Sequence, residues 1–256
     1  MKSPADETGT PVVEQRPAPA PLFGEEPFSR NIPTISAADQ ERLAKSTACV
    51  VGCGGLGGFI CEFLVRLGVG HLVAVDADVF APSNLNRQVL ATRDTLGRSK
   101  ALCAAERARA INPEVRVDVH EVFLDQGNAR ELIAGADVVV DALDNPASRV
   151  VLEAACEGAG LVLVHGAVRG QLAQVAVIHP GEGTLARIYE GHTDLGGLDA
   201  DALRTLKSTL SFTPPLAASL EVAEALKVLL GQERGIGAGE LVLVDARRMT
   251  MQRVRL

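Results

Sequence analysis

Hydrophobic residues are arranged in short runs of four or five along most of the chain, and more polar stretches separate these runs. The runs are rich in valine and mostly lack the strict alternation of a half-exposed strand, which is typical of strands buried on both faces. Six runs of this kind predict strands at 48–51, 72–75, 115–119, 138–141, 161–164 and 175–178.

Helical patterns lie between the predicted strands. They begin near Gly55, Ser99, Asn128 and Ala147, and Asn112-Pro113 ends the second of them. Upstream, the polar segment from Ser36 to Asp39 predicts the capped start of a short helix over 40–45. Because strand and helix alternate, the pattern predicts an α/β fold with a doubly wound, mainly parallel, Rossmann-like sheet.

The alternation ends after Pro180. A glycine-containing stretch over about 183–213 is expected to form a loop or lid, followed by a helix over 216–230 and a hairpin from 241–245 and 251–255 that adds antiparallel strands. Residues 1–28 are proline-rich and predict a flexible tail. The rest, 29–256, is expected to be one domain, with a nucleotide-binding half over about 46–180, the crossover segment over about 183–213, and the C-terminal helix and hairpin over 214–256.

Charge and hydropathy exclude several function classes. Of 256 residues, 25 are Lys or Arg and 32 are Asp or Glu, so a net charge of −7 disfavours nucleic acid and anionic lipid as partners. No apolar run reaches the roughly 18 residues of a membrane helix, and the N-terminus lacks an apolar export segment. We therefore expect a cytoplasmic protein without a membrane or nucleic-acid partner.

The cysteine pattern indicates neither disulfides nor a zinc site. The five cysteines are odd in number, scattered and without a C-x-x-C pair, and they are Cys49, Cys53, Cys61, Cys103 and Cys156.

A glycine-rich motif follows the first predicted strand. The segment Gly52-Cys-Gly-Gly-Leu-Gly57 has the spacing that lets backbone amides approach phosphates at the start of a helix. Asp76 ends the second strand 24 residues after Gly52, where an acidic residue binds ribose hydroxyls. The alternatives are a tight turn that binds nothing and a solvated acid at the rim of the sheet. At this point NAD and ATP fit equally well.

The segment after Asp76 favours a triphosphate. Ser83-Asn-Leu-Asn-Arg-Gln88 places several hydrogen-bonding side chains and one guanidinium on the ligand side of the sheet, and further cations follow at Arg93, Arg98 and Lys100. Such cations bind phosphate oxygens and neutralise the charge that develops during phosphoryl transfer, whereas hydride transfer does not need them. A solvated polar loop is the alternative.

The fourth predicted strand leads to Asp144 and Asn145 at the same edge of the sheet. A carboxylate there could hold Mg²⁺ against the phosphates. Alternatively, Asp144 and Asn145 only cap the following helix. Asp141, on the same strand, is expected to have a structural role, either in packing or in capping.

Together these motifs resemble the ThiF/MoeB/HesA family, the bacterial relatives of ubiquitin-activating enzymes. The stretches that carry the resemblance are Gly52–Gly57, Gly68–Leu72 leading to Asp76-Ala-Asp78, Ser83–Gln88, Gly97–Lys100, Ile111–Pro113 and Asp141–Asn145. Phe28–Asn31 is similar to the family's arginine-bearing entry motif, and Ala218–Lys227 is similar to its late helix. The similarity therefore extends from about residue 28 to the C-terminus.

The resemblance implies an eight-stranded sheet, a homodimer, and ATP-Mg²⁺-dependent adenylation of the C-terminal Gly-Gly carboxylate of a small ubiquitin-like sulfur carrier. By position it implies that Asp76 holds the ribose, that Asn84, Arg87 and Lys100 hold the phosphates, that Asp144 holds Mg²⁺, and that Arg30 reaches the γ-phosphate in the neighbouring subunit. The full candidate set comprises the catalytic Arg30, Arg87, Lys100 and Asp144 and the nucleotide-binding Gly52, Gly54, Gly55, Gly57, Asp76, Asp78, Asn84, Gln88 and Asn145.

Two departures from the family pattern bear on chemistry. Many members hold a structural zinc with two C-x-x-C pairs, but Thr184–Arg187 replaces the first pair and no second pair follows, so no zinc ligands are expected. Some members carry a cysteine in the crossover segment, but no cysteine follows Cys156 here. We hypothesise that the chemistry stops at the acyl-adenylate and that a separate sulfur donor attacks it.

Four other functions remain open. Within the same enzyme class, the resemblance also fits a tRNA threonylcarbamoyladenosine dehydratase or a peptide-adenylating enzyme. An NAD-dependent oxidoreductase would use the same glycine loop, although the cations after Asp76 argue against it. A non-catalytic scaffold that binds nucleotide is consistent with the missing cysteines. The leading interpretation is a carrier-protein adenylyltransferase for thio-cofactor biosynthesis, such as that of thiamine or molybdopterin.

Overall fold

The structure, a computed structural model, describes residues 27–189 and 208–256. Residues 1–26 of the expected tail over 1–28, and residues 190–207 in the central part of the expected crossover segment, lie outside the described residues. Strands are β1 (Thr47–Val51), β2 (His71–Val75), β3 (Arg116–His120), β4 (Val138–Asp141), β5 (Leu163–Arg169), β6 (Leu172–Ile178), β7 (Glu240–Asp245) and β8 (Thr250–Arg255). Helices are α1 (Ala37–Lys45), α2 (Gly57–Leu67), α3 (Lys100–Ile111), α4 (Ala129–Leu132), α5 (Pro146–Ala159), α6 (Thr184–Tyr189) and α8 (Thr213–Leu230), with short 3-10 turns at Ser29–Asn31, Pro82–Asn84 and Arg93–Thr95.

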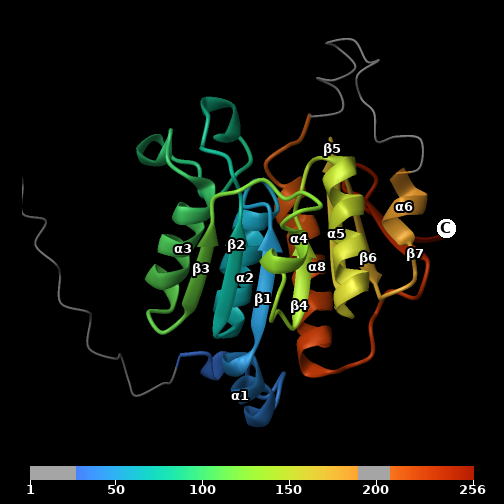
Figure 1. The fold of residues 1–256 in the computed structure, drawn as a ribbon, viewed down its shortest axis with the longest axis horizontal. Coiled ribbons are helices and arrows are strands. Elements are labelled where there is room, and N and C mark those ends of the chain that lie inside the picture. The colour runs from blue at the N-terminus through green and yellow to red at the C-terminus, as the bar shows by residue number, and fades with distance from the viewer. Residues whose placement is uncertain (1–26, 190–207) are drawn as a thin grey trace, which may run out of the picture.

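One eight-stranded sheet runs through the molecule in the order β3-β2-β1-β4-β5-β6-β7-β8 (Figure 1). The first five strands in this order are parallel, and β6, β7 and β8 are added antiparallel. Val51 pairs with Val75 on one side and with Asp141 on the other, so β1, β2 and β4 end at the same level. This register brings the loops after the three strands together at one edge of the sheet.

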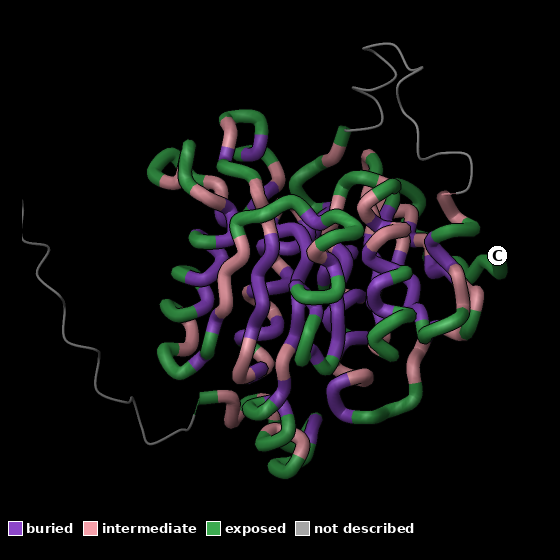
Figure 2. Tube along the Cα trace, viewed as in Figure 1, coloured by how far each residue is buried: buried purple, intermediate pink, exposed green. Residues whose placement is uncertain are grey.

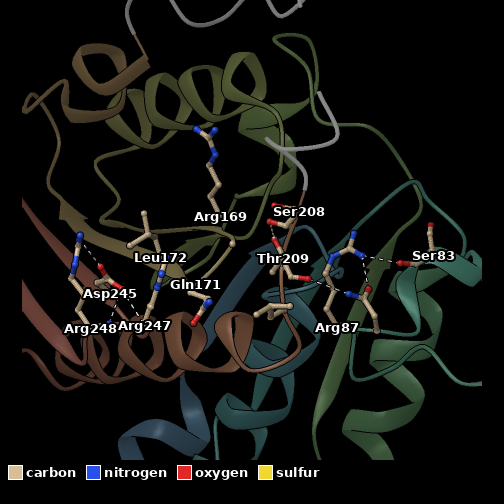
Figure 3. A pocket seen from close by; sticks show the side chains of 13 residues that line it. Ser83, Arg87, Arg169, Gln171, Leu172, Ser208, Thr209, Asp245, Arg247 and Arg248 are labelled. Carbon is tan, nitrogen blue, oxygen red and sulfur yellow. Dashed lines mark hydrogen bonds and ion pairs between the residues drawn. The ribbon is translucent and has the colours of Figure 1, made fainter. Parts of the chain in front are cut away.

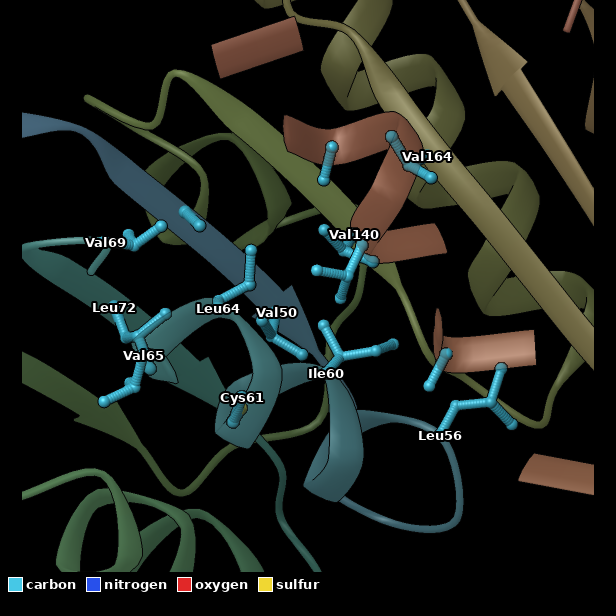
Figure 4. Close-up of a cluster of buried hydrophobic side chains, with 14 of the residues drawn as sticks. Val50, Leu56, Ile60, Cys61, Leu64, Val65, Val69, Leu72, Val140 and Val164 are labelled. Atoms are coloured by element: carbon cyan, nitrogen blue, oxygen red, sulfur yellow. The ribbon is translucent and has the colours of Figure 1, made fainter. Parts of the chain in front are cut away.

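Helices cover both faces of the sheet, and the strand sequences explain why. Along β1, Ala48 and Val50 point into one core and Cys49 and Val51 into the other, and all four are buried. The first core, part of which Figure 4 shows, packs the sheet against α2, α3 and α8, and the second packs it against α4, α5 and α6. Figure 2 shows that the buried residues are concentrated in the strands at the centre of the fold. Strands buried on both faces have to be apolar at every position, which is the valine-rich pattern of this chain.

Side-chain caps fix several helix starts where the sequence predicted them. The Ser36 hydroxyl accepts a hydrogen bond from the Asp39 amide (3.1 Å), and the Asp39 carboxylate accepts one from the Ser36 amide (3.1 Å), which completes a capping box for α1. Ser99 likewise caps α3 through the Leu102 amide (3.3 Å), and α3 ends before Pro113 as expected.

The second half of the sheet differs from the prediction. Strands β5 and β6 are longer than the predicted 161–164 and 175–178, and they form a hairpin around Gly170, whose φ is +60°. Polar residues such as Gln174 and Arg169 interrupt the apolar pattern, while the antiparallel ladder continues past them because backbone groups make it. A local hydrophobic pattern cannot detect that continuation.

Helix α6 lies inside the stretch expected to be a loop. Its first turn is capped from a distant helix, because the buried Glu153 carboxylate of α5 accepts hydrogen bonds from the Leu185 (2.8 Å) and Ala186 (2.9 Å) amides. Helix α8 also begins earlier than the predicted 216, at Thr213, with prolines in its first turn. Within 27–189 and 208–256, no helix combines the length and apolar character required to cross a bilayer.

Candidate active site

The glycine-rich segment after β1 is a tight loop that leaves no room for side chains at two positions. Gly52 has φ +96°, and a Cβ there would lie 2.6 Å from the Ala142 carbonyl oxygen after β4. A Cβ on Gly57 would lie 1.7 Å from the Gly52 carbonyl oxygen. The loop is therefore packed against the end of β4, as the sequence motif predicts for a phosphate-binding turn.

The start of α2 offers hydrogen-bond donors to a ligand. No side chain caps the first turn, whose N-cap residue is Leu56, and uncapped first-turn amides favour an anion. The buried Gln88 lies against this loop, with its Nε2 atom 3.4 Å from the Cβ position of Gly54, and its Oε1 atom has no hydrogen-bond partner in the described chain. Buried polar atoms are nearly always paired, so this arrangement fits a polar ligand that lies over the loop.

Asp76 joins the end of β2 to the glycine loop. Its Oδ2 atom accepts a hydrogen bond from the Cys53 amide (2.7 Å), and its Oδ1 atom accepts one from the Asp78 amide (2.8 Å). Burial raises the pKa of Asp76, although these two amides and the Lys100 ammonium act in the opposite direction. The carboxylate is half-buried beside the loop, in the position from which an acid binds ribose hydroxyls.

Lys100 is held in place by an acid that the sequence assigned to nucleotide binding. Its ammonium forms an ion pair with the Asp78 carboxylate (2.8 Å), and Lys100 is buried at the start of α3. Asp78 therefore contacts a predicted phosphate-binding cation.

The segment over 83–88 forms a compact turn with its own hydrogen bonds. The buried Asn84 side chain accepts a hydrogen bond from the Ala81 amide (2.9 Å). The Arg87 guanidinium donates to the Ser83 carbonyl (2.8 Å) and to the Asn86 side chain (2.9 Å), and Arg87 is half-buried. These contacts use one of its nitrogens, so the other two keep donors for a phosphate.

Asp144 and Asn145 follow β4 and have different surroundings. Asn145 is the N-cap of α5 and accepts a hydrogen bond from the Ala147 amide (2.9 Å), so the capping alternative is confirmed for this residue. Asp144 is exposed, and among the described residues its carboxylate has no hydrogen-bond or ion-pair partner. An unpaired carboxylate oxygen at this edge fits Mg²⁺, which is usually held by one or two carboxylates together with substrate phosphates.

A cavity of about 900 Å³ opens beside Arg87 (Figure 3). Figure 3 shows Ser83 and Arg87 on one side and the turn between β7 and β8 on the other. Its wall includes the Thr209 carbonyl, which accepts a hydrogen bond from Asn86 (3.1 Å), and Ser208, whose carbonyl accepts one from the Gly170 amide (2.7 Å). The lining residues are Ser83, Asn86, Arg87, Arg169, Gly170, Gln171, Leu172, Ser208, Thr209, Leu210, Asp245, Arg247 and Arg248.

Sequence reasoning missed the arginines on the far side of this cavity. Arg169 ends β5, and Arg247 and Arg248 lie in the turn after β7. Their positions in the sequence are far from the glycine loop and carry no motif, so only the hairpin geometry of β5 to β8 brings them to the cavity.

Of the predicted site residues, the structure gathers all but one at the carboxyl edge. Arg30 lies in the turn before α1, and its neighbour Asn31 donates to the Leu67 carbonyl at the end of α2. That contact places the segment at the opposite edge of the sheet (Figure 1). Within one chain Arg30 is therefore remote from the glycine loop, and a role in the site requires a second copy.

The comparisons with known proteins agree with this geometry. A model of the ThiF family matches residues 28–256. The chain belongs to the ThiF family. It is 37% identical over 229 residues to the SAMP-activating enzyme E1 of Haloferax volcanii, covering 89% of this chain and 83% of that protein. It is 39% identical over 242 residues to the sulfur carrier protein adenylyltransferase of Thermus thermophilus, covering 87% and 84%.

A solved structure supports the fold of this ThiF-family chain. The crystal structure of E. coli MccB with ATP matches with a TM-score of 0.75 and 19% identity, covering 91% of this chain and 71% of that chain. At this identity the similarity concerns the fold, and it confirms the mixed sheet with a parallel core and antiparallel strands at the C-terminal end.

The cysteines of this ThiF-family chain bear on the expected absence of zinc ligands. All five cysteines are free and buried. Thr184–Arg187, which replace the first cysteine pair of many members, form most of α6. Among the described residues there is no group of three or more His, Cys, Asp or Glu side chains arranged for a metal ion.

Proposed function

We propose that this chain is an ATP- and Mg²⁺-dependent adenylyltransferase that activates the C-terminal Gly-Gly carboxylate of a small ubiquitin-like sulfur carrier for thio-cofactor biosynthesis. The observation that carries this proposal is the grouping of an uncapped glycine loop, two cations and an unpaired carboxylate at one edge of the sheet. The relatives named for SAMP activation and for sulfur carrier adenylylation support the enzyme class and the kind of partner.

The proposed reaction needs no general base. The carrier's terminal carboxylate is already ionised at neutral pH, and its oxygen forms a bond to the α-phosphorus of ATP. The bond between that phosphorus and the oxygen bridging to the β-phosphate breaks, and pyrophosphate leaves with the electron pair. The chemical difficulty is to hold two anions together.

The residues of the carboxyl edge address that difficulty. Asp76 would orient the ribose, and the amides of the glycine loop would hold the phosphates. Arg87 and Lys100 would neutralise the charge that builds on the transferring phosphoryl group. Asp144 would hold Mg²⁺, which supplies charge neutralisation on the phosphate oxygens. The cavity beside Arg87 would receive the extended C-terminal tail of the carrier.

The family resemblance also supports a homodimer. Because Arg30 lies at the opposite edge of its own sheet, it could complete a nucleotide site only in a neighbouring subunit. A dimer in solution would support this arrangement. So would complementation: Arg30→Ala and Arg87→Ala should each be inactive alone, and a mixture of the two variants should regain activity.

The decisive experiment is pyrophosphate–ATP exchange in the presence of a candidate carrier with a free C-terminal Gly-Gly carboxylate. We expect exchange with this carrier and none with the same carrier as a C-terminal amide. Arg87→Ala should lower the exchange rate by about 100-fold or more, whereas Arg66→Ala, on the far end of α2, should leave it unchanged. Equal exchange with the amide, or binding of NAD without ATP, would contradict the proposal. If the wild type binds the carrier but catalyses no pyrophosphate–ATP exchange, the result would favour the non-catalytic nucleotide-binding scaffold.

A further inference from the structure

A buried polar network lies beside the predicted magnesium residue, and apart from Asp141 its members stand outside the sequence motifs that indicate the activity. It consists of Asp141 on β4, Arg149 on α5, His165 on β5, Gln174 on β6 and Tyr189 at the end of α6. Asp141 and His165 are fully buried and Arg149 is 7% exposed. Charged groups are rarely buried without a specific arrangement of partners, because their desolvation is costly.

Two members of this network hold the backbone of Leu143, one at its amide and the other at its carbonyl. The Leu143 amide donates to the Asp141 Oδ1 atom (2.9 Å). The Leu143 carbonyl accepts from Arg149, through Nε (3.1 Å) and through Nη2. Leu143 is the residue directly before Asp144, so these bonds fix the backbone from which the Asp144 carboxylate projects.

The Arg149 guanidinium is itself held by contacts with Asp141 and Tyr189 and by a hydrogen bond from its Nη2 to the Gly166 carbonyl (3.5 Å). Its Nε lies 3.5 Å from the Asp141 Oδ2 atom, which balances its charge. Its Nη1 donates to the Tyr189 hydroxyl, and its central carbon lies 5.3 Å from the centre of the Tyr189 ring. The aromatic contact and the hydroxyl together restrict the guanidinium to one plane.

The remaining members close the network around Asp141. The Asp141 Oδ2 atom accepts a hydrogen bond from His165 Nδ1 (2.7 Å), and Gln174 Nε2 donates to His165 Nε2 (3.1 Å) and to the Tyr189 hydroxyl (3.3 Å). Burial lowers the pKa of His165, although the hydrogen bond to Asp141 acts in the opposite direction. A neutral imidazole protonated at Nδ1 satisfies both bonds, so Asp141 and Arg149 are the charged pair.

We propose that Arg149 is a positioning residue for Asp144, acting through the Leu143 carbonyl, and that the Tyr189 hydroxyl keeps the Arg149 guanidinium in the orientation this requires. The inference rests on the proposed function, because Asp144 is the group that would hold Mg²⁺. It assigns a role to α6, the helix that the sequence did not predict. No member of the network lines the cavity beside Arg87, so we expect its effect to be confined to the metal-dependent part of nucleotide binding.

The test compares Tyr189→Phe and Arg149→Lys with the wild type by calorimetric titration with ATP, once with Mg²⁺ and once with EDTA. Tyr189→Phe removes only the hydroxyl, and Arg149→Lys keeps the charge without the fork that reaches Leu143 and Tyr189. In the wild type, Mg²⁺ is expected to raise the affinity for ATP above its value in EDTA. In both variants this increase should be about tenfold smaller, as is typical when residues behind a metal ligand change. Affinity in EDTA should stay unchanged. Arg107→Lys, which alters the ion pair with Glu62 between α2 and α3, is the matched control and should keep the full gain.

A second readout does not depend on ligand. Hydrogen exchange of the Leu143 and Asp144 amides should be faster in both variants than in the wild type, while exchange in β1 and β2 is unchanged. Equal exchange at Leu143, or a full Mg²⁺ gain in both variants, would overturn the positioning role while leaving the proposed function intact. A wild type that does not bind ATP would instead overturn the proposed function, and with it this role toward Mg²⁺.

Discussion

The Asp76 carboxylate accepts a hydrogen bond from the Cys53 amide at 2.7 Å, so the acid that ends β2 is tied to the glycine loop that follows β1. The two residues are 23 positions apart in the chain. Because Val51 and Val75 pair at the ends of their strands, the parallel register brings this amide and this carboxylate together. The proposed ribose site is thus formed before a nucleotide is bound.

This contact predicts that Asp76→Asn weakens ATP binding by about tenfold or more. An amide nitrogen in place of Oδ1 or Oδ2 would face an N–H donor, either of Cys53 or of Asp78, and one buried donor would lose its acceptor. Calorimetric titration with ATP measures the change. Asp39→Asn is the matched control. Asp39 also accepts a hydrogen bond from a backbone amide, the Ser36 amide, but it lies at the opposite edge of the sheet. It should leave ATP affinity unchanged, and an equal loss in both variants would contradict a direct role for Asp76.

A second prediction concerns the glycine loop. Gly57→Ala should destabilise the protein by about 3 kcal/mol, because the new Cβ would lie 1.7 Å from the Gly52 carbonyl oxygen and the backbone has to move. Gly158→Ala provides the control, since a Cβ there meets nothing within 4 Å on the exposed side of α5, and it should stabilise by about 0.5–1 kcal/mol. Urea unfolding of both variants checks the opposite signs. Similar midpoints for the two would show that the loop is less tightly packed than described.

A third prediction follows from Glu221, which is fully buried on α8 with neither carboxyl oxygen hydrogen-bonded in the described chain. It packs against Gly166, where a Cβ would lie 2.1 Å from its carboxyl carbon. Burial raises the pKa of Glu221 well above the ordinary 4.5, and Asp141 adds to the effect. The folded protein therefore keeps a proton that the unfolded chain releases, and stability falls as pH rises above 4.5.

Glu221→Gln should remove this pH dependence. Relative to the wild type, the variant should become more stable as pH rises from about 5 to about 8, because it has no carboxyl group to ionise in the core. Urea midpoints at the two pH values measure the difference. If the urea midpoints of the wild type and the variant change equally between the two pH values, Glu221 is not protonated in the folded protein.

A fourth prediction tests whether the chemistry stops at the acyl-adenylate. No cysteine follows Cys156, and the five cysteines are buried. Burial raises the pKa of Cys156 to about 12 and also raises that of Cys49, so these thiols are poor nucleophiles at neutral pH. With carrier and ATP, a non-reducing gel should show no covalent enzyme–carrier adduct that a thiol reductant removes. Such an adduct would contradict the hypothesis, and Cys→Ser variants would then identify the cysteine that forms it.

Much of the fold follows from local patterns. Valine-rich runs predicted β1 to β4 to within one residue, and polar caps at Ser36 and Ser99 predicted two helix starts, because burial on both faces and helix capping are decided by neighbouring residues. The glycine loop, Asp76 and the segment over 83–88 could be proposed as site residues because phosphate binding requires fixed spacing after a strand.

What local patterns could not supply is the set of contacts between distant segments. The cap of α6 comes from Glu153, the cavity wall from Arg169, Arg247 and Arg248, and the support of the Asp144 loop from Arg149 and Tyr189. None of these residues stands in a motif, since each acts only through an orientation that the packed helices and the antiparallel hairpins impose.

The sequence by itself therefore determined the layered α/β architecture, the tight glycine loop after β1 and the resemblance to the family, because hydrophobic periodicity and glycine spacing act over a few residues. The tertiary structure alone decided that Asp78 pairs with Lys100, that Arg30 lies at the opposite edge of the sheet, and that Asp144 follows a residue whose amide and carbonyl are both held by buried side chains. Those relationships depend on strand register and on the burial of charges, and both are properties of the whole packed chain.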